Sequence, residues 1–237
     1  MDLNFSEEQE MLRKAAHDFL EKECPKTLVR EMEEDEKGYS PEMWYKMAEL
    51  GWQGLLVPET YGGEGGDFLD MIVLMEEMGR ACLPGPFFST VILGGGTILE
   101  AGSEQQKHDL LPRIAKGELI VTLALTEPSA SYNSTGIAVR AIANKDSYRI
   151  DGIKLFVPDA HISNYIVCVA RAGEGITLFL VDSRRPGIAC TLLKTVAGDK
   201  QCEVVFQDVE VPVQDMLGQV GRGWEYIDKV MQQAALA

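Results

Sequence analysis

The sequence predicts an α+β fold, in which an all-α helical domain is followed by an antiparallel β-barrel or β-sandwich domain and then by the first helix of a further helical domain. Three observations lead to this prediction. Apolar residues recur at helical spacing up to about residue 117, form short runs between turn residues up to about residue 220, and return to helical spacing at the end. The predicted domains are therefore residues 1–117, 118–220 and 221–237.

Three helix starts in the first domain are predicted from serines that can cap a helix. Two have the capping-box pattern, in which a glutamine three residues later bonds back to the serine, and the third has proline directly after the serine. These starts are Ser6 with Gln9, Ser103 with Gln106, and Ser40 with Pro41.

Apolar spacing predicts two more helices, over residues 69–78 and 88–101. Pro112 has no N–H and clashes with the preceding turn, so we expect it to end or kink the helix that starts at Ser103. The glycine-rich segment 62–66 follows no predicted strand, so we expect a connecting loop there and not a phosphate-binding loop.

From residue 119 the period changes to that of strands. The runs are short, lie close together and have no helical pattern between them, which favours antiparallel pairing. Turn residues such as Asp151–Gly152 and Pro186–Gly187 separate them. The predicted strands are residues 119–125, 137–142, 148–150, 155–157, 165–170, 176–181, 188–193 and 203–211.

The last predicted helix has an apolar face, formed by Trp224, Ile227, Val230 and Met231. Such a face is normally buried against a partner, because packing and not propensity stabilises most short helices. No terminating signal precedes Ala237. We therefore expect the chain to be a fragment, or half of an assembly.

Composition limits the function. The 237 residues carry 37 acidic and 22 basic side chains, a net charge of −15, which disfavours binding to nucleic acid or to anionic membranes. No stretch predicts a secretory signal or a membrane span. The five cysteines form no C-x-x-C pair and the three histidines lie far apart, so we expect free thiols, a cytoplasmic location and no metal site.

Two motifs carry a resemblance. Residues 123–130, Leu-Ala-Leu-Thr-Glu-Pro-Ser-Ala, are similar to the T-E-P flavin-binding segment of acyl-CoA dehydrogenases, and residues 151–156, Asp-Gly-Ile-Lys-Leu-Phe, resemble that family's second signature. Shorter matches keep the same order along nearly the whole chain. They are residues 5–9, 58–63, 102–112 and 206–212.

The resemblance covers the first two of the family's three domains and implies that FAD lies between the middle domain and an absent C-terminal helical bundle. It implies α,β-desaturation of an acyl-CoA thioester, by removal of the α-proton and transfer of the β-hydrogen as hydride to flavin N5, within acyl-CoA metabolism. It also implies an electron-transfer flavoprotein as acceptor and a homodimer or homotetramer.

The resemblance further implies roles for individual residues. Some would contact the flavin or its pyrophosphate, and Tyr132 would also approach the thioester tail. A second group, at helical spacing, would line the acyl pocket, although such residues are core by default. The cofactor set is Leu123, Leu125, Thr126, Ser131, Tyr132, Phe156, Val157 and Pro158, and the substrate set is Tyr132, Phe87, Phe88 and Val91, with Ile92 beside them.

The chain departs from the family pattern in three places. Ser131-Tyr132-Asn133 stands where the family has Gly-Ser-Asp, so the glycine that lets the backbone approach FAD closely is absent. Pro158 stands where a threonine or serine is usual and has no donor for N5. The stretch 233–235 has no carboxylate, so the catalytic base is unknown and is expected in the absent domain; alone, this chain should be inactive.

Two alternatives stay open beside the dehydrogenase. The chain could be a non-catalytic or heteromeric partner that needs another subunit for the base, which Tyr132 and Pro158 favour. It could also be a module that binds CoA thioesters and has no redox role.

Overall fold

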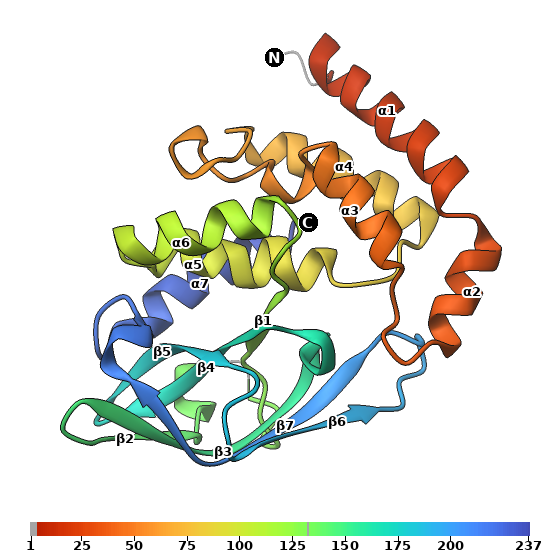
Figure 1. Cartoon of the computed structure of the whole chain (residues 1–237). Coiled ribbons are helices and arrows are strands. Elements are labelled where there is room, and N and C mark those ends of the chain that lie inside the picture. The colour runs from red at the N-terminus through yellow and green to blue at the C-terminus, as the bar shows by residue number, and fades with distance from the viewer. Residues whose placement is uncertain (1–3, 132) are drawn as a thin grey trace.

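The computed structural model describes residues 4–131 and 133–237. Helices make up the N-terminal half and strands most of the C-terminal half, and one more helix ends the chain (Figure 1). The helices are α1 (Glu7–Glu23), α2 (Lys26–Glu34), α3 (Pro41–Glu49), α4 (Phe68–Ala81), the π-helical segment η3 (Phe88–Gly95), α5 (Gly96–Ala101), α6 (Glu104–Ala115) and α7 (Gly223–Ala234). Five single turns of 3₁₀ helix connect longer elements: η1 (Trp52–Gly54), η2 (Glu59–Tyr61), η4 (Ser134–Gly136), η5 (Ala160–Ile162) and η6 (Val213–Asp215).

All three serine caps are confirmed. The Ser6 and Ser103 side chains accept from the backbone N–H three residues later, and each glutamine bonds back, which completes both capping boxes. Ser40 caps α3, with Pro41 as its first residue. These ends are correct because a cap depends only on residues within one turn.

The helix predicted over residues 88–101 consists of two parts, η3 and α5. The segment passes directly over the first strand: a Cβ on Gly94 would lie 2.6 Å from the Val121 carbonyl oxygen. Pro112 does not end α6, which runs on to Ala115 because Leu111 and Ile114 are buried in the core on either side of the proline. Tertiary packing outweighs the local penalty here.

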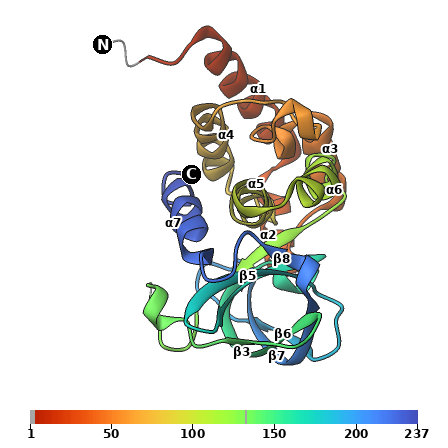
Figure 2. The ribbon, with the colours of Figure 1, turned by 90° about the vertical axis from the view of Figure 1, so that its left-hand side faces the viewer.

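Eight strands form one sheet, which curves into a barrel-like layer below the helices (Figure 2). Its order is β6-β7-β3-β2-β4-β5-β8, with β1 paired to β4. The bounds are β1 (Val121–Ala124), β2 (Arg140–Ala143), β3 (Ser147–Pro158), β4 (Tyr165–Ala172), β5 (Gly175–Asp182), β6 (Ile188–Leu193), β7 (Gln201–Pro212) and β8 (Met216–Leu217).

The sheet is mixed and not purely antiparallel as predicted. β1 pairs with β4 in parallel, and β2 meets β4 in parallel at Arg140 and Arg171. The other pairings are antiparallel. Strand direction depends on connections across the fold, which residue spacing does not record.

The turn predicted at Asp151–Gly152 is wrong, because both residues lie inside the continuous strand β3. The register between β3 and β7 shifts twice, so each strand contains one bulge. The bulge residues Asp208 and Phe156 have left-handed backbones, with φ of 52° and 51°. Gly152, with φ of 141°, lies opposite the first bulge.

Three apolar cores hold the layers together. One lies within the N-terminal helices, one inside the curved sheet, and one between the sheet and helices α5, α6 and α7. α7 buries Ile227 and Val230 against α5, η3 and β5, while Met231 is partly exposed. Within residues 4–131 and 133–237 no helix is both long and apolar enough to cross a membrane.

Candidate functional site

The two sequence motifs lie side by side. The T-E-P segment follows β1, and the end of β3 runs alongside it: the Leu155 N–H donates to the Thr126 carbonyl at 2.9 Å. Within β1 itself, the Thr122 hydroxyl donates to the carbonyl of Pro158, the last residue of β3, at 2.5 Å. These two bonds bring the segment 123–126 next to residues 156–158, although the bonded residues are 29 and 36 positions apart in the sequence.

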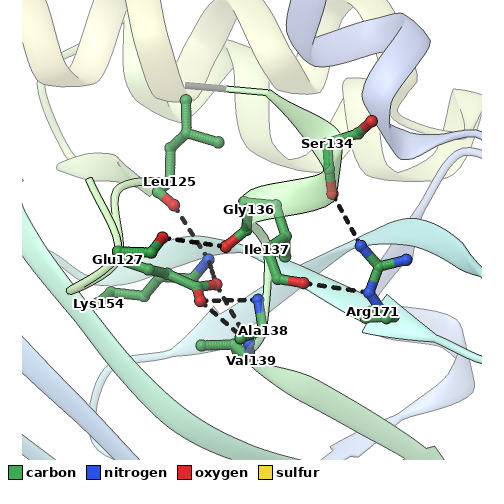
Figure 3. Close-up of polar contacts among 10 residues, drawn as sticks. Leu125, Glu127, Ser134, Gly136, Ile137, Ala138, Val139, Lys154 and Arg171 are labelled. Carbon is green, nitrogen blue, oxygen red and sulfur yellow. Dashed lines mark hydrogen bonds and ion pairs between the residues drawn. The ribbon is translucent and has the colours of Figure 1, made fainter. Parts of the chain in front are cut away.

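A buried ion pair fixes this arrangement (Figure 3). Lys154 on β3 is fully buried and Glu127 is 4% exposed, and the Lys154 ammonium donates to a Glu127 carboxylate oxygen at 2.7 Å. The same ammonium donates to the Leu125 carbonyl at 3.1 Å. The backbone N–H groups of Ala138 and Val139 donate to the carboxylate at 2.7 Å and 3.1 Å.

A buried pair stabilises a fold only when its remaining hydrogen-bonding positions are also used. Here the carboxylate accepts from the ammonium and from two backbone donors, and the ammonium also reaches a carbonyl. The pair therefore links three segments: the T-E-P segment, β3 and the chain that enters β2. Although both residues occur in the motifs, the sequence analysis did not predict their pairing.

Arg171 on β4 holds the part of the chain that leads from the T-E-P segment into β2. Its guanidinium donates to the Ser134 carbonyl at 2.8 Å and to the Ile137 carbonyl at 3.1 Å (Figure 3). Ser131, a predicted pyrophosphate contact, lies between the two anchors and donates to the Asn133 side chain at 3.3 Å. Tyr132, predicted to contact both cofactor and substrate, lies outside the described residues.

The predicted flavin contacts differ in burial. Leu123 is buried in the core between the sheet and the helices, and Leu125 is partly buried and packs against that core. Val157 is buried inside the sheet, so its side chain faces away from Phe156. Phe156 is 57% exposed, with a left-handed backbone at the β3 bulge. A bulge re-aims one side chain, and an exposed aromatic held in a strained backbone points to a function for the ring.

The predicted acyl-pocket residues face different spaces. Phe87 is buried in the helical core. Phe88 lines a cavity of about 320 Å³ between the helices and the sheet, together with Pro158. Val91 and Ile92 line a separate cavity of about 220 Å³ beside α7. The structure therefore does not bring all four residues to one pocket.

The cavity beside α7 is mostly apolar. Val230 and Gln233 of α7 line it, and Glu100 is the one carboxylate among the described residues that do so. Glu100 forms an ion pair with Lys229. A carboxylate already paired with a lysine is a poor base.

The 320 Å³ cavity contains a buried carboxyl that the sequence analysis missed. Asp159 is 8% exposed and accepts a hydrogen bond of 2.6 Å from the Ser89 hydroxyl on η3. Burial raises the pKa of Asp159 to about 6, and the bond from Ser89 opposes that shift. In the sequence, the only sign of this carboxyl is an acidic residue that follows the end of a predicted strand. Across the described parts of the chain, no group of three metal-ligating side chains is arranged to hold an ion.

Comparison with known proteins agrees with this geometry. Residues 6–118 match the model of the acyl-CoA dehydrogenase N-terminal domain, and residues 122–209 match that of the middle domain. The chain is 32% identical, over 241 residues, to the short-chain specific acyl-CoA dehydrogenase of Clostridium acetobutylicum, covering 98% of this chain and 63% of the relative. It is 31% identical to the caffeyl-CoA reductase-Etf complex subunit CarC of Acetobacterium woodii, covering 98% and 64%.

A solved structure is similar over most of the fold. The acyl-CoA dehydrogenase of Bacillus anthracis, complexed with FAD, superposes with a TM-score of 0.87 at 27% identity, over 96% of this chain and 40% of that one. The chain thus spans less than two thirds of the length of the relatives it matches. The two domain matches and the paired motifs show that this chain belongs to the acyl-CoA dehydrogenase family.

Proposed function

We propose that this chain forms the N-terminal and middle domains of an FAD-dependent acyl-CoA dehydrogenase, which introduces an α,β double bond into an acyl-CoA thioester. One observation carries the proposal. The T-E-P segment and the exposed Phe156 are held side by side by buried contacts that do not involve Phe156 itself. A prearranged surface of this kind suits a bound group that is flat and partly apolar.

The residues present fit a flavin. Phe156 offers an exposed ring for stacking, and its left-handed backbone at the β3 bulge turns that ring outward. Leu125 and Thr126 lie at the end of β1 and offer main-chain N–H groups, since both of their carbonyls already accept hydrogen bonds, and the Thr126 hydroxyl lies beside them. Pro158 offers no hydrogen-bond donor, so we expect a flavin edge at that position to lack one hydrogen bond, worth about 1 kcal/mol.

The chemistry requires an acid–base group and a dry site. A carboxylate removes the α-proton only when donors polarise the thioester carbonyl and water is excluded. FAD, when bound, supplies the hydride acceptor. The chain's own contribution in this proposal is to bind and orient, because the described α7 residues facing the nearby cavity include no free carboxylate.

We also propose an electron-transfer flavoprotein as the redox partner and a homodimer or homotetramer as the assembly. The partner is supported by the similarity to a subunit of a reductase-Etf complex. Relatives named as dehydrogenases and as reductases both match, so the direction of the reaction would follow the potential of the partner and not these two domains.

The proposal is tested by titrating the protein with FAD and following the quenching of flavin fluorescence. Phe156→Ala should weaken FAD binding by about tenfold, as loss of one stacking ring does elsewhere. Ile142→Ala is the matched control, because Ile142 is 60% exposed on β2. It should leave FAD affinity unchanged. Equal affinity of all three proteins, or no FAD binding at all, would contradict the proposal.

A heteromeric or non-catalytic partner is the second candidate, and Pro158 favours it because this residue removes a donor beside the flavin. A third is a module that binds CoA thioesters only. Titration with a CoA thioester separates them: binding of thioester without FAD supports the module. Binding of FAD with normal affinity only after a second, different chain is added supports the heteromer.

A further inference from the structure

The cavity of about 320 Å³ contains a carboxylate oxygen that has no hydrogen-bond donor. Asp159 lines this cavity, and one oxygen of its buried carboxylate accepts from the Ser89 hydroxyl at 2.6 Å. The other oxygen accepts no hydrogen bond from the described residues. Buried polar atoms normally have partners, and an unpaired buried charge is costly. A donor that enters the cavity could supply the missing bond.

The basic side chains near Asp159 are engaged elsewhere. Lys200 also lines the cavity, but its ammonium donates to the Glu33 carbonyl at 2.8 Å. The Nε2 of His161 lies 3.3 Å from the Lys37 carbonyl oxygen, and its Nδ1 faces the Cys202 sulfur. Across residues 4–131 and 133–237, Asp159 forms no ion pair. Its charge is therefore not compensated by a cation of the chain.

A structural role alone does not explain an aspartate at this position. Asp159 follows the end of β3 with a left-handed backbone, at φ 54° and ψ 18°, which asparagine and aspartate both tolerate. An asparagine of the same size could keep the bond to Ser89 without a buried charge. Residues that break a local rule of stability are expected mainly where function requires them. The carboxylate therefore points to a ligand that uses its charge.

The cavity adjoins the proposed flavin surface, which is formed by the T-E-P segment and Phe156. Val157 points into the sheet, so its neighbours Phe156 and Pro158 both face outward. Pro158 also lines the cavity. Two residues of strand span about 7 Å, so the cavity begins close to the exposed ring. A substrate that lies beside a flavin on this surface has the cavity as space for its remaining part.

The walls of the cavity suit a short alkyl chain with one polar group. Val29 and Met32 of α2 line it, together with Phe88 of η3, and these side chains are apolar. Ser89 and Asp159 place buried polar atoms at one point of the wall. Small-molecule pockets typically combine apolar walls with a few placed polar groups, and 320 Å³ lies at the lower end of their volumes. The space therefore fits a chain of a few carbons.

We propose that the acyl chain of the substrate carries a hydrogen-bond donor, a hydroxyl or an amine, at the end remote from the thioester, and that Asp159 selects for this donor. The inference rests on the proposed function. The chain would extend past Pro158 and Phe88, and its donor would bind the free Asp159 oxygen. A chain that ends in a methyl group would displace water from the carboxylate and offer no bond in return. Asp159 is thus a specificity-determining residue.

The test measures the affinity of the FAD-loaded protein for three CoA thioesters at neutral pH by isothermal titration calorimetry. Hexanoyl, ω-hydroxyhexanoyl and ω-aminohexanoyl chains are equally long and end in a methyl, a hydroxyl and an ammonium group. We expect each polar end to bind about tenfold more tightly than the methyl end, as for one hydrogen bond to a charged group. The same three ends on butanoyl and octanoyl chains cover the lengths on either side.

Two variants assign the preference to Asp159. Asp159→Asn keeps the size of the side chain and an acceptor for Ser89, so it should fold, bind FAD and lose the preference for the ammonium end. Its preference for the hydroxyl end should weaken, because the bond is then made to a neutral group. Glu33→Gln is the matched control, since Glu33 is an exposed carboxylate that lines the same cavity. It should keep both preferences, and circular dichroism confirms the fold of each variant.

The possible results separate this inference from the proposed function. Equal affinity for the three ends at every chain length contradicts the inference alone. The same holds for an ammonium preference that survives in Asp159→Asn, or that is lost equally in Glu33→Gln, because the charge of Asp159 would then not be its source. Failure to bind FAD, or to bind any of the thioesters, contradicts the proposed function and this inference with it.

Discussion

Breaking the buried pair between Lys154 and Glu127 should destabilise the protein more than any surface substitution. Removing one partner of a buried pair leaves an uncompensated charge and costs about 3 to 5 kcal/mol. In Lys154→Met the carboxylate keeps its two backbone donors, Ala138 and Val139, so we expect a cost at the lower end of that range.

Glu127→Gln should cost more. The amide oxygen can keep the position that accepts from the ammonium and from the Val139 N–H, but the NH₂ group then faces the Ala138 N–H, which is also a donor. The Lys154 ammonium is left with the Leu125 carbonyl and that single amide oxygen. We expect a loss near the upper end, about 5 kcal/mol.

The double variant Glu127→Gln/Lys154→Met distinguishes charge from packing. Without a buried charge, its cost should be smaller than the sum of the single costs by about 2 kcal/mol or more. The assay is urea unfolding followed by circular dichroism at neutral pH, with the midpoint and slope recorded for each variant. Single costs below about 1 kcal/mol, or costs that simply add, would refute the view that this pair anchors the T-E-P segment.

Two further predictions concern packing and pH. Gly94→Ala should cost about 1 to 3 kcal/mol in urea unfolding, because the new Cβ would lie 2.6 Å from the Val121 carbonyl oxygen. Gly79→Ala, with nothing within 4 Å of its Cβ, should stabilise by about 0.5 to 1 kcal/mol, and equal effects would contradict the close approach. Burial raises the pKa of Asp159 from 3.8 to about 6, so the folded state binds more protons than the unfolded state between these values, and stability falls as pH rises through them. With the Ser89 bond retained, Asp159→Asn should therefore be more stable than the parent by up to about 3 kcal/mol above pH 6 and equally stable below pH 3.8. Urea unfolding at both pH values measures this difference, and a difference that does not change with pH would contradict the reasoning.

The parts of the fold predicted from sequence are those that depend on nearby residues. The capping boxes at Ser6 and Ser103 need only a partner three residues away, and both are present. The parallel pairing of β1 with β4 joins residues more than 40 positions apart, such as Val121 and Tyr165, and no spacing rule records it. The Asp151–Gly152 turn was predicted from residue type alone, but pairing with β7 keeps the strand continuous there.

The candidate site shows the same limit. The motifs identified the residues of the T-E-P segment and of β3, and the structure places the two segments side by side. The bond between Ser89 and Asp159 spans 70 positions, and neither residue is unusual locally. The substrate set was predicted from residues at helical spacing, whereas two separate cavities divide it.

Strand alternation alone would place Phe156 in the core. Inward-facing positions on β3 include Ile150 and Lys154, both fully buried, and the next position in that series is Phe156. The bulge inserts one residue after Lys154, so Val157 takes the inward place and the phenyl ring turns out. The same strand thus buries the lysine that fixes the T-E-P segment and, two residues later, exposes the ring beside it. A sheet without this bulge would bury the ring and leave the proposed flavin surface without its aromatic side chain.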